Sequence, residues 1–319
     1  MATVSSVLGP LDTQNMGFTL VHEHVLAASA GVMQAFPEYI NRAQVLDDAI
    51  AALSQAKAEG LGTFIDLSTV DLGRDIRLIA EASQRSGVHI IACTGIWRDI
   101  PRVFWGEHPD TIARLFIREI EQGIEGTGIR AGVIKVATHT EGVTPAGEII
   151  LRAAARAQKA TGVPISTHTW APARTGEEQV RIFQEEGVDL NRVCIGHSNE
   201  TQDLGYLTGL LDQGVWLGMD RYPGGHIPSS LTWEQRTATF KQVMDAGHTD
   251  RVMLSHDASI TLFNEGTPEF RAYRKGLNPD GICFIFRKVL PRLRQLGASD
   301  SDLYRITVEN PRRFFEGAT

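Results

Sequence analysis

The stretch GFTLVHEH, residues 17–24, is the first of eight short apolar runs that each end in a residue able to take part in chemistry. Most of the runs are rich in valine and isoleucine, as expected of parallel strands covered by helices on both sides. The other seven are TFIDLST (63–69), HIIACTGIW (89–97), AGVIKVAT (131–138), PISTHT (164–169), RVCIGHS (192–198), VWLGMD (215–220) and RVMLSHD (251–257). The sequence therefore predicts eight parallel strands.

Helical patterns lie between these runs. Their apolar residues recur three and four positions apart, and most of the patterns stop at a glycine, which suits a helix C-terminus. They cover residues 43–60, 74–87, 109–126, 146–162, 176–187, 201–214 and 233–247. Eight strand–helix units close into a (β/α)8 barrel, so we expect one domain over residues 1–319, with its site at the C-terminal ends of the strands.

A doubly wound open sheet is the competing architecture, but no Gly-x-Gly-x-x-Gly motif follows a strand. The longest predicted loops follow the seventh strand, at residues 221–232, and the eighth, at residues 258–281. Loops of this length commonly carry function, so we expect both to roof the pocket.

The composition of the chain argues against nucleic acid and membranes as partners. The net charge of −7 and the pI near 5.8 give no basic surface for nucleic acid or for an anionic membrane. No run of ~18 apolar residues could span a bilayer, and residues 1–16 lack the pattern of a secretory signal, so we expect a cytoplasmic protein. The three cysteines, Cys93, Cys194 and Cys283, are far apart and odd in number, which favours core packing over disulfides or metal ligation.

Two histidines end the first strand. Strand alternation directs His22 and His24 to one face and Glu23 to the other, so both imidazoles could hold one cation. On its own an HxH motif is a weak signal, since two surface or core histidines would give it as well. Here His168 and His197 end two further strands in the same way, which favours a metal site.

Lys135 lies in a run that should be buried, where an unpaired ammonium is costly. Addition of CO2 to the neutral amine would give a carbamate, an anionic ligand able to bridge two cations. The alternative is a lysine paired with a carboxylate elsewhere in the chain.

Asp257 ends the eighth strand and offers a hard oxygen ligand that can also accept a proton from a metal-bound water. His256 should point away from the metals. Two adjacent divalent ions would activate a bridging water and polarise an acyl or phosphoryl oxygen. No Gly-x-Ser-x-Gly elbow, HExxH helix or activated thiol offers another scheme.

These residues resemble the phosphotriesterase family of the amidohydrolase superfamily over nearly the full chain. The specific stretches are GFTLVHEHV, GIRAGVIKVAT, ATGVPISTHT, RVCIGHS, LSHD and ENPRRFF. The resemblance implies a (β/α)8 barrel, a homodimer, and two divalent ions (zinc, or else Co, Mn or Fe) bridged by carboxylated Lys135 and hydroxide. By motif, His22, His24 and Asp257 would hold the more buried ion, and His168 and His197 the more exposed one.

The motifs that bear on substrate preference resemble two different branches of this family. Trp97 in TGIW and NPDG at residues 278–281 resemble the triesterase branch, whereas MDRY at residues 219–222 and SHD at residues 255–257 resemble the lactonases. A tyrosine usually stands at the position of Trp97 in lactonases. His226 is the one histidine of the seventh loop, where the triesterases carry a proton-relay histidine. We expect Trp97, Arg221, Tyr222 and Phe263 to contact a small-molecule substrate, and Asp220 to act beside Asp257.

The sequence thus predicts a binuclear-metal hydrolase that opens lactones or aromatic cyclic esters and also cleaves phosphotriesters. Two alternatives remain: a dedicated aryldialkylphosphatase with residual lactonase activity, and a non-catalytic metal-binding barrel.

Overall fold

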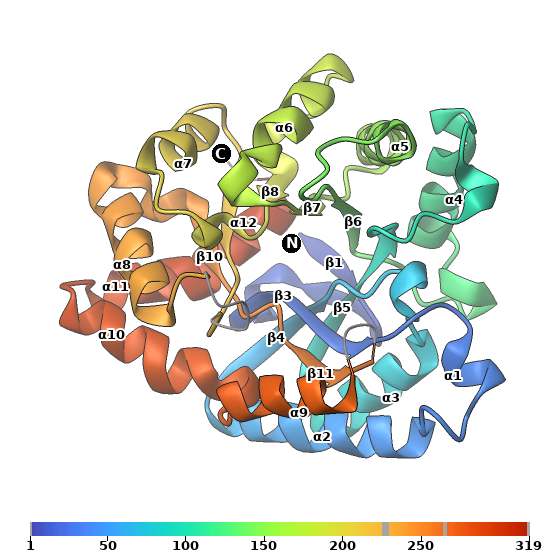
Figure 1. Cartoon of the computed structure of the whole chain (residues 1–319), viewed down its shortest axis with the longest axis horizontal. Coiled ribbons are helices and arrows are strands. Elements are labelled where there is room, and N and C mark those ends of the chain that lie inside the picture. The colour runs from blue at the N-terminus through green and yellow to red at the C-terminus, as the bar shows by residue number, and fades with distance from the viewer. Residues whose placement is uncertain (1, 225–229, 264–266, 318–319) are drawn as a thin grey trace.

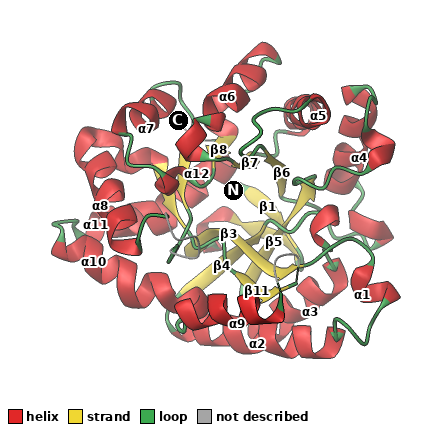
Figure 2. Cartoon of the chain, in the orientation of Figure 1, coloured by secondary structure: helices red, strands yellow, loops and turns green. Residues whose placement is uncertain are grey.

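The computed structural model describes residues 2–224, 230–263 and 267–317. Its main sheet has nine parallel strands in the order β10-β9-β8-β7-β6-β5-β4-β3-β11. Two of them, β10 (Val252–Leu254) and β11 (Ser259–Leu262), are consecutive parts of the eighth barrel strand, and only β10 falls within the predicted run 251–257. They pair with β9 and β3 respectively. The sheet therefore closes into a (β/α)8 barrel, with strands in the middle and helices around them (Figures 1 and 2).

All eight predicted strands are confirmed. The remaining seven are β3 (Phe18–Ala27), β4 (Leu61–Asp66), β5 (His89–Gly95), β6 (Val133–Ala137), β7 (Ile165–His168), β8 (Val193–Ile195) and β9 (Trp216–Met219).

The seven predicted helices are also present, with bounds that differ by a few residues. They are α2 (Arg42–Ala58), α3 (Ile76–Ser86), α4 (Pro109–Glu121), α5 (Pro145–Thr161), α6 (Thr175–Glu185), α7 (Leu204–Leu211) and α8 (Trp233–Val243). Side-chain caps fix several starts: Asn41, Thr144 and Thr232 each accept a backbone N–H from the first turn. The other helices are α1 (Val32–Ala35), α9 (Pro268–Leu277), α10 (Leu290–Gln295), α11 (Asp300–Tyr304) and α12 (Asn310–Glu316).

The prediction of one long loop over residues 258–281 is wrong. That segment contains β11, which completes the barrel, and α9, which begins with Pro268 at its first position. The strand was hidden because Asp257, at φ 54°, interrupts it and separates β11 from the apolar run before it. His226, in the other predicted loop, lies outside the described residues.

The N-terminal end of the barrel is closed by a hairpin of β1 (Thr3–Ser6) and β2 (Gly9–Asp12). The Val7 N–H donates to the carbonyl of Ile90 at the start of β5. Inside this end lies an apolar cluster that includes Met16, Ile65, Trp216, Met253 and Phe314. The packed interior therefore leaves the C-terminal ends of the strands as the place for a site.

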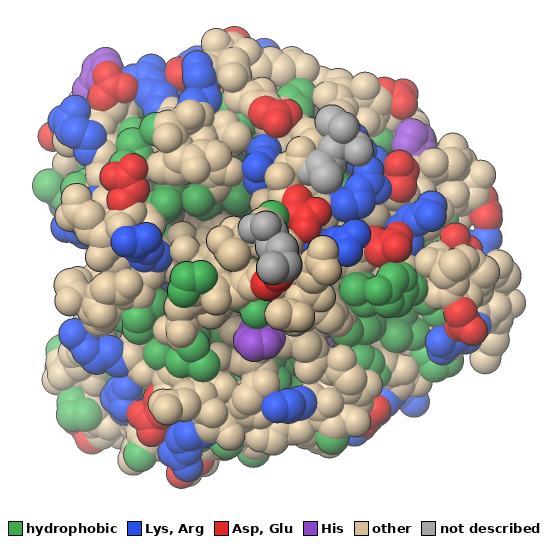
Figure 3. Space-filling view, turned by 180° about the vertical axis from the view of Figure 1, so that it is seen from behind, with side chains coloured by type: hydrophobic (Ala, Val, Ile, Leu, Met, Phe, Trp, Pro, Cys, Tyr) green, Lys and Arg blue, Asp and Glu red, His purple; other side chains and the backbone are tan. Residues whose placement is uncertain are grey.

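Seen from behind (Figure 3), basic and acidic side chains are interspersed on the described part of that face. No helix in the described ranges has both the length and the apolar character needed to cross a membrane. The three cysteines are buried and unpaired, which confirms that they pack in the core.

Candidate metal centre

Six side chains from five strand ends converge at the C-terminal end of the barrel. They are the predicted ligands His22 and His24 on β3, Lys135 on β6, His168 on β7, His197 after β8 and Asp257 after β10. His22, Lys135 and His197 are at most 1% exposed, so this is a buried polar cluster at the end of an apolar barrel.

One set of atoms surrounds Asp257 Oδ1. It lies 3.2 Å from His24 Nε2 and 3.5 Å from His22 Nε2. Ligand atoms bonded to one cation at about 2.1 Å lie roughly 3 to 3.5 Å apart. The donor set His22, His24 and Asp257 therefore fits a divalent ion such as zinc.

A second set lies beside the first. His168 Nδ1 is 2.7 Å from His197 Nε2, and His197 Nε2 is 3.8 Å from Asp257 Oδ2. These two imidazoles offer nitrogen ligands for a second ion. Asp257 borders both sets, which suits two ions held close together.

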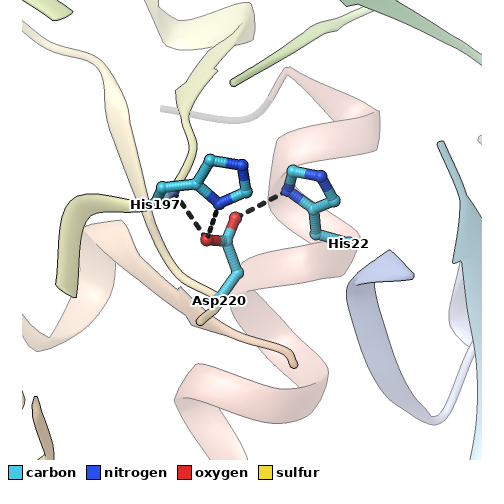
Figure 4. Close-up of side chains that lie close together, drawn as sticks. All are labelled: His22, His197 and Asp220. Atoms are coloured by element: carbon cyan, nitrogen blue, oxygen red, sulfur yellow. Dashed lines mark hydrogen bonds and ion pairs between the residues drawn. The ribbon is translucent and has the colours of Figure 1, made fainter. Parts of the chain in front are cut away.

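Asp220 orients one histidine of each set (Figure 4). Its Oδ2 accepts from His22 Nδ1 at 2.8 Å, and its Oδ1 accepts from His197 Nδ1 at 2.9 Å and from the His197 backbone N–H at 2.6 Å. With each Nδ1 donating to this carboxylate, each Nε2 presents its lone pair to the ligand cluster. Asp220 thus contacts the sides of the two imidazoles that face away from the ligand cluster. The sequence had suggested that it acts beside Asp257.

Burial keeps the imidazoles neutral. It lowers the pKa of His22, His168 and His197 well below the usual value of 6.5, and nearby cations (Lys135 for His22, Arg221 for the other two) lower it further. A neutral imidazole is the form that binds a metal. The three rings are therefore ready to act as ligands at neutral pH.

Lys135 has an unusual environment for an amine. It is 0% exposed, and its Nζ lies 2.7 Å from His22 Nε2. Within the described ranges no carboxylate forms a salt bridge with it. Burial lowers the pKa of Lys135 to about 8. The charges of Asp257 and Asp220 oppose this shift, but the buried amine is still deprotonated more readily than an exposed lysine.

Arg221 and Glu200 extend the site on the other side of Asp257. Arg221 Nε lies 2.7 Å from Asp257 Oδ2, and its Nη1 lies 3.4 Å from Glu200 Oε1. Burial raises the pKa of Asp257, but the charge of Arg221 and the hydrogen bond with His24 outweigh that effect, so the pKa is held well below its usual range. Asp257 is therefore a carboxylate with both oxygens engaged.

A cavity of about 670 Å³ opens beside Asp257 and Arg221. Phe263 and Tyr222 also border it, but Tyr222 is only 3% exposed and its hydroxyl lies 3.4 Å from Thr237 Oγ1. Much of the remaining wall is apolar and comes from α2, β11 and α9, with Ile282 just beyond them; it includes Ala51, Ala52, Ile260, Leu262 and Leu277. The size and lining suit a small organic molecule.

Trp97 lies on the side of the second ligand set. Its Nε1 is 3.3 Å from His168 Nδ1, and its ring contacts that of His168 edge-on. The buried carboxylate of Asp71 accepts the Trp97 backbone N–H at 3.0 Å and fixes the start of this loop. Trp97 is therefore held beside the ligand cluster, but it is not among the residues that line the cavity.

Sequence reasoning missed His139, which contacts the ligand cluster, and Glu23, which contacts the residues on either side of Asp257. His139 Nδ1 lies 3.0 Å from His168 Nε2, the nitrogen turned away from His197. Its signal was a further histidine just after the β6 strand, four positions beyond Lys135. Glu23 was placed on the opposite face of β3 and given no role, but its carboxylate accepts from His256 Nδ1 at 2.6 Å. His256 points away from the ligand cluster.

The chain is similar to known proteins over nearly its full length. The model of the phosphotriesterase family matches residues 2–315. A "phosphotriesterase homology protein" of Mycobacterium tuberculosis is 39% identical, covering 99% of this chain and 98% of its own. An "aryldialkylphosphatase" of Saccharolobus solfataricus is 36% identical, with 96% of each chain covered.

A solved structure shows the same similarity. The structure of the phosphotriesterase from Mycobacterium tuberculosis superposes with a TM-score of 0.93 at 39% identity, covering 99% of this chain and 98% of that one. Matches over nearly the full length, in sequence and in fold, extend well beyond the ligand motifs. The chain is a hydrolase and belongs to the phosphotriesterase family.

Proposed function

We propose that this chain is a binuclear-metal hydrolase that opens lactones or aromatic cyclic esters and also cleaves phosphotriesters. The observation that carries the proposal is the position of Lys135, a buried amine without a carboxylate partner in the described structure. A carbamate formed there would offer two oxygens as ligands, one toward each ligand set. The ligands are His22, His24 and Asp257 in one set and His168 and His197 in the other.

Ions held by these residues would supply an activated water and would polarise the carbonyl or phosphoryl oxygen. The protein's own groups do the rest. Asp257 accepts the proton of the attacking water, and Arg221 keeps its carboxylate oriented through the 2.7 Å contact. Asp220 is a positioning residue, because both of its oxygens are engaged by His22 and His197.

The cavity supports a substrate with an apolar part. Phe263 and the aliphatic residues of β11 and α9 give one wall, while Arg221 places a cation near the reacting bond. This arrangement suits a lactone or an aryl ester with the scissile group toward Asp257 and its apolar part between α2 and α9. Trp97, near His168, would contact the leaving group or the ring.

A dedicated aryldialkylphosphatase is the second candidate, supported by the name of the Saccharolobus relative. The test compares kcat/KM for an aryl dialkyl phosphate and an aromatic lactone on the same metal-loaded preparation. Higher values for the lactone support the proposal, and higher values for the phosphotriester support the alternative. If the protein holds its full complement of metal ions and hydrolyses neither substrate, the result would support the alternative of a non-catalytic metal-binding barrel.

We also propose a homodimer. Five large apolar side chains are exposed on the segments that follow β3, β4 and β5: Phe36, Tyr39, Val70, Val103 and Trp105 are 42–73% exposed. Such residues are candidates for a self-association surface. Sedimentation of the wild type and of a Trp105→Glu, Val103→Glu variant tests this, since the proposal expects a dimer in the first and a monomer in the second.

A further inference from the structure

The eighth barrel strand is broken at the site itself. It pairs with β9 through β10 and with β3 through β11, and residues 255–258 lie between these two pieces. Within this break Asp257 has φ 54°, the left-handed region that residues with a Cβ avoid. A conformation of this kind costs on the order of 1–3 kcal/mol and persists only when its surroundings impose it. Some group must therefore hold this segment.

The carboxylate of Glu23 contacts the segment on both sides of Asp257. Its Oε1 accepts from Ser255 Oγ at 2.7 Å, from the His256 backbone N–H at 2.8 Å and from His256 Nδ1 at 2.6 Å. Its Oε2 accepts from the Ala258 backbone N–H at 2.9 Å. Glu23 is 0% exposed, so these donors replace its contacts with water.

The donors are themselves fixed. Ser255 Oγ accepts the His22 backbone N–H at 2.9 Å, and His256 Nε2 accepts the Ile285 backbone N–H at 3.1 Å. With Nε2 as an acceptor, the neutral His256 ring carries its proton on Nδ1 and donates it to Glu23. The Asp257 N–H donates to the His22 carbonyl at 2.9 Å, so the segment is tied to β3 along its whole length.

We propose that Glu23 is a positioning residue that acts through Asp257. By holding the backbone on either side, it turns Oδ1 toward His22 and His24 and leaves Oδ2 for Arg221. This inference rests on the proposed function, because it takes Asp257 as a metal ligand. Both faces of β3 thus serve the site, since His22 and His24 bind the ion and Glu23 orients the third ligand.

The test is Glu23→Gln, which keeps the shape. The amide of glutamine cannot accept a hydrogen bond from every donor that Glu23 contacts. If its nitrogen takes the position of Oε2, two N–H groups face each other there, that of the amide and that of the Ala258 backbone. Loss of a group that orients a ligand typically weakens metal affinity ~10–100-fold. We expect a loss in that range for zinc, measured by competition with a chromophoric chelator, together with an altered visible spectrum of the Co(II)-loaded protein.

A double-mutant cycle with Asp257→Asn separates action through Asp257 from a general disturbance of His22 and His24. If Glu23 acts through Asp257, adding Glu23→Gln to Asp257→Asn weakens zinc binding little further. Additive losses would overturn the inference. So would a Glu23→Gln protein that melts at a lower temperature but keeps wild-type zinc affinity and the wild-type Co(II) spectrum.

Two further proteins complete the experiment. Glu119→Gln is the matched control, because it removes a carboxylate from the buried Arg74 elsewhere in the barrel wall and should leave zinc affinity unchanged. If Glu23→Gln does not fold, Ser255→Ala removes one of the donors and should weaken zinc binding in the same direction, while wild-type affinity would contradict the inference. A wild type that binds no zinc would instead refute the proposed function.

Discussion

Arg221 and Asp257 form an ion pair at the mouth of the ligand cluster, with Nε 2.7 Å from Oδ2. The two side chains are 16% and 15% exposed, so water screens them little. The other oxygen of Asp257 faces His24 at 3.2 Å. The carboxylate of Asp257 therefore lies between the ligand cluster and the cavity, and Arg221 keeps it charged from the cavity side.

Replacing Arg221 should shift the acid limb of the pH–rate profile. The Arg221 charge lowers the pKa of Asp257, so Arg221→Gln raises that pKa. As the pH falls, Asp257 is then protonated sooner, and kcat/KM should decline at a higher pH than in the wild type. Arg221→Lys keeps the charge and should shift the limb less. Identical acid limbs in all three proteins would show that Asp257 is not the group that titrates.

Carboxylation of Lys135 should depend on pH in the metal-free protein. Burial lowers the pKa of Lys135 to about 8, so about a tenth of the amine is neutral at pH 7, far more than for an exposed lysine. Because CO2 adds only to the neutral amine, reactivation by bicarbonate and zinc should accelerate from pH 6 to pH 8 and then level off. The rate is measured by recovery of activity at fixed dissolved CO2. A rate independent of pH would contradict the carbamate.

Asp220→Asn should weaken the binding of at least one of the two ions. The amide keeps one acceptor oxygen, so either His22 or His197 loses its partner and its fixed orientation. We expect ~10–100-fold weaker metal affinity, measured as metal retained after dialysis against graded chelator. Asp212→Asn, at an exposed aspartate after α7, is the control and should behave as wild type. If Asp220→Asn retains both ions as fully as the wild type, the assignment of Asp220 as a positioning residue is wrong.

His139 should affect only the second ligand set. Its Nδ1 lies 3.0 Å from His168 Nε2, so His139→Phe removes the partner that orients the His168 ring. We expect loss of one ion per chain at a chelator concentration that leaves the wild type fully loaded. His139→Asn places a polar atom near the position of Nδ1 and should restore binding in part. Equal loss of both ions from His139→Phe would contradict separate ligand sets.

Much of the barrel follows from local patterns in the sequence. Eight apolar runs and the helical periodicities between them place the strands and seven of the helices. The ligand candidates follow from position alone, since residues at the ends of parallel barrel strands meet at one face. His22 and His24 also share a side because strand side chains alternate.

What the sequence could not give depends on contacts between distant residues. Asp220 and His22 are 198 positions apart, and only the closed barrel brings the carboxylate behind the ring. Glu23 carries no local signal of a role, because its partners lie 232 to 235 positions away. The break at Asp257 likewise hid β11, because strand patterns assume continuous extended backbone.

A binuclear centre bridged by carboxylated Lys135 can be checked by counting metal ions on protein prepared with bicarbonate, with the intact mass measured under non-acidic conditions. We predict two divalent ions per chain and a mass increment of one CO2 that disappears in a Lys135→Met variant. One ion or none, with no CO2 increment and no gain of activity on adding zinc or cobalt, would contradict the proposed centre.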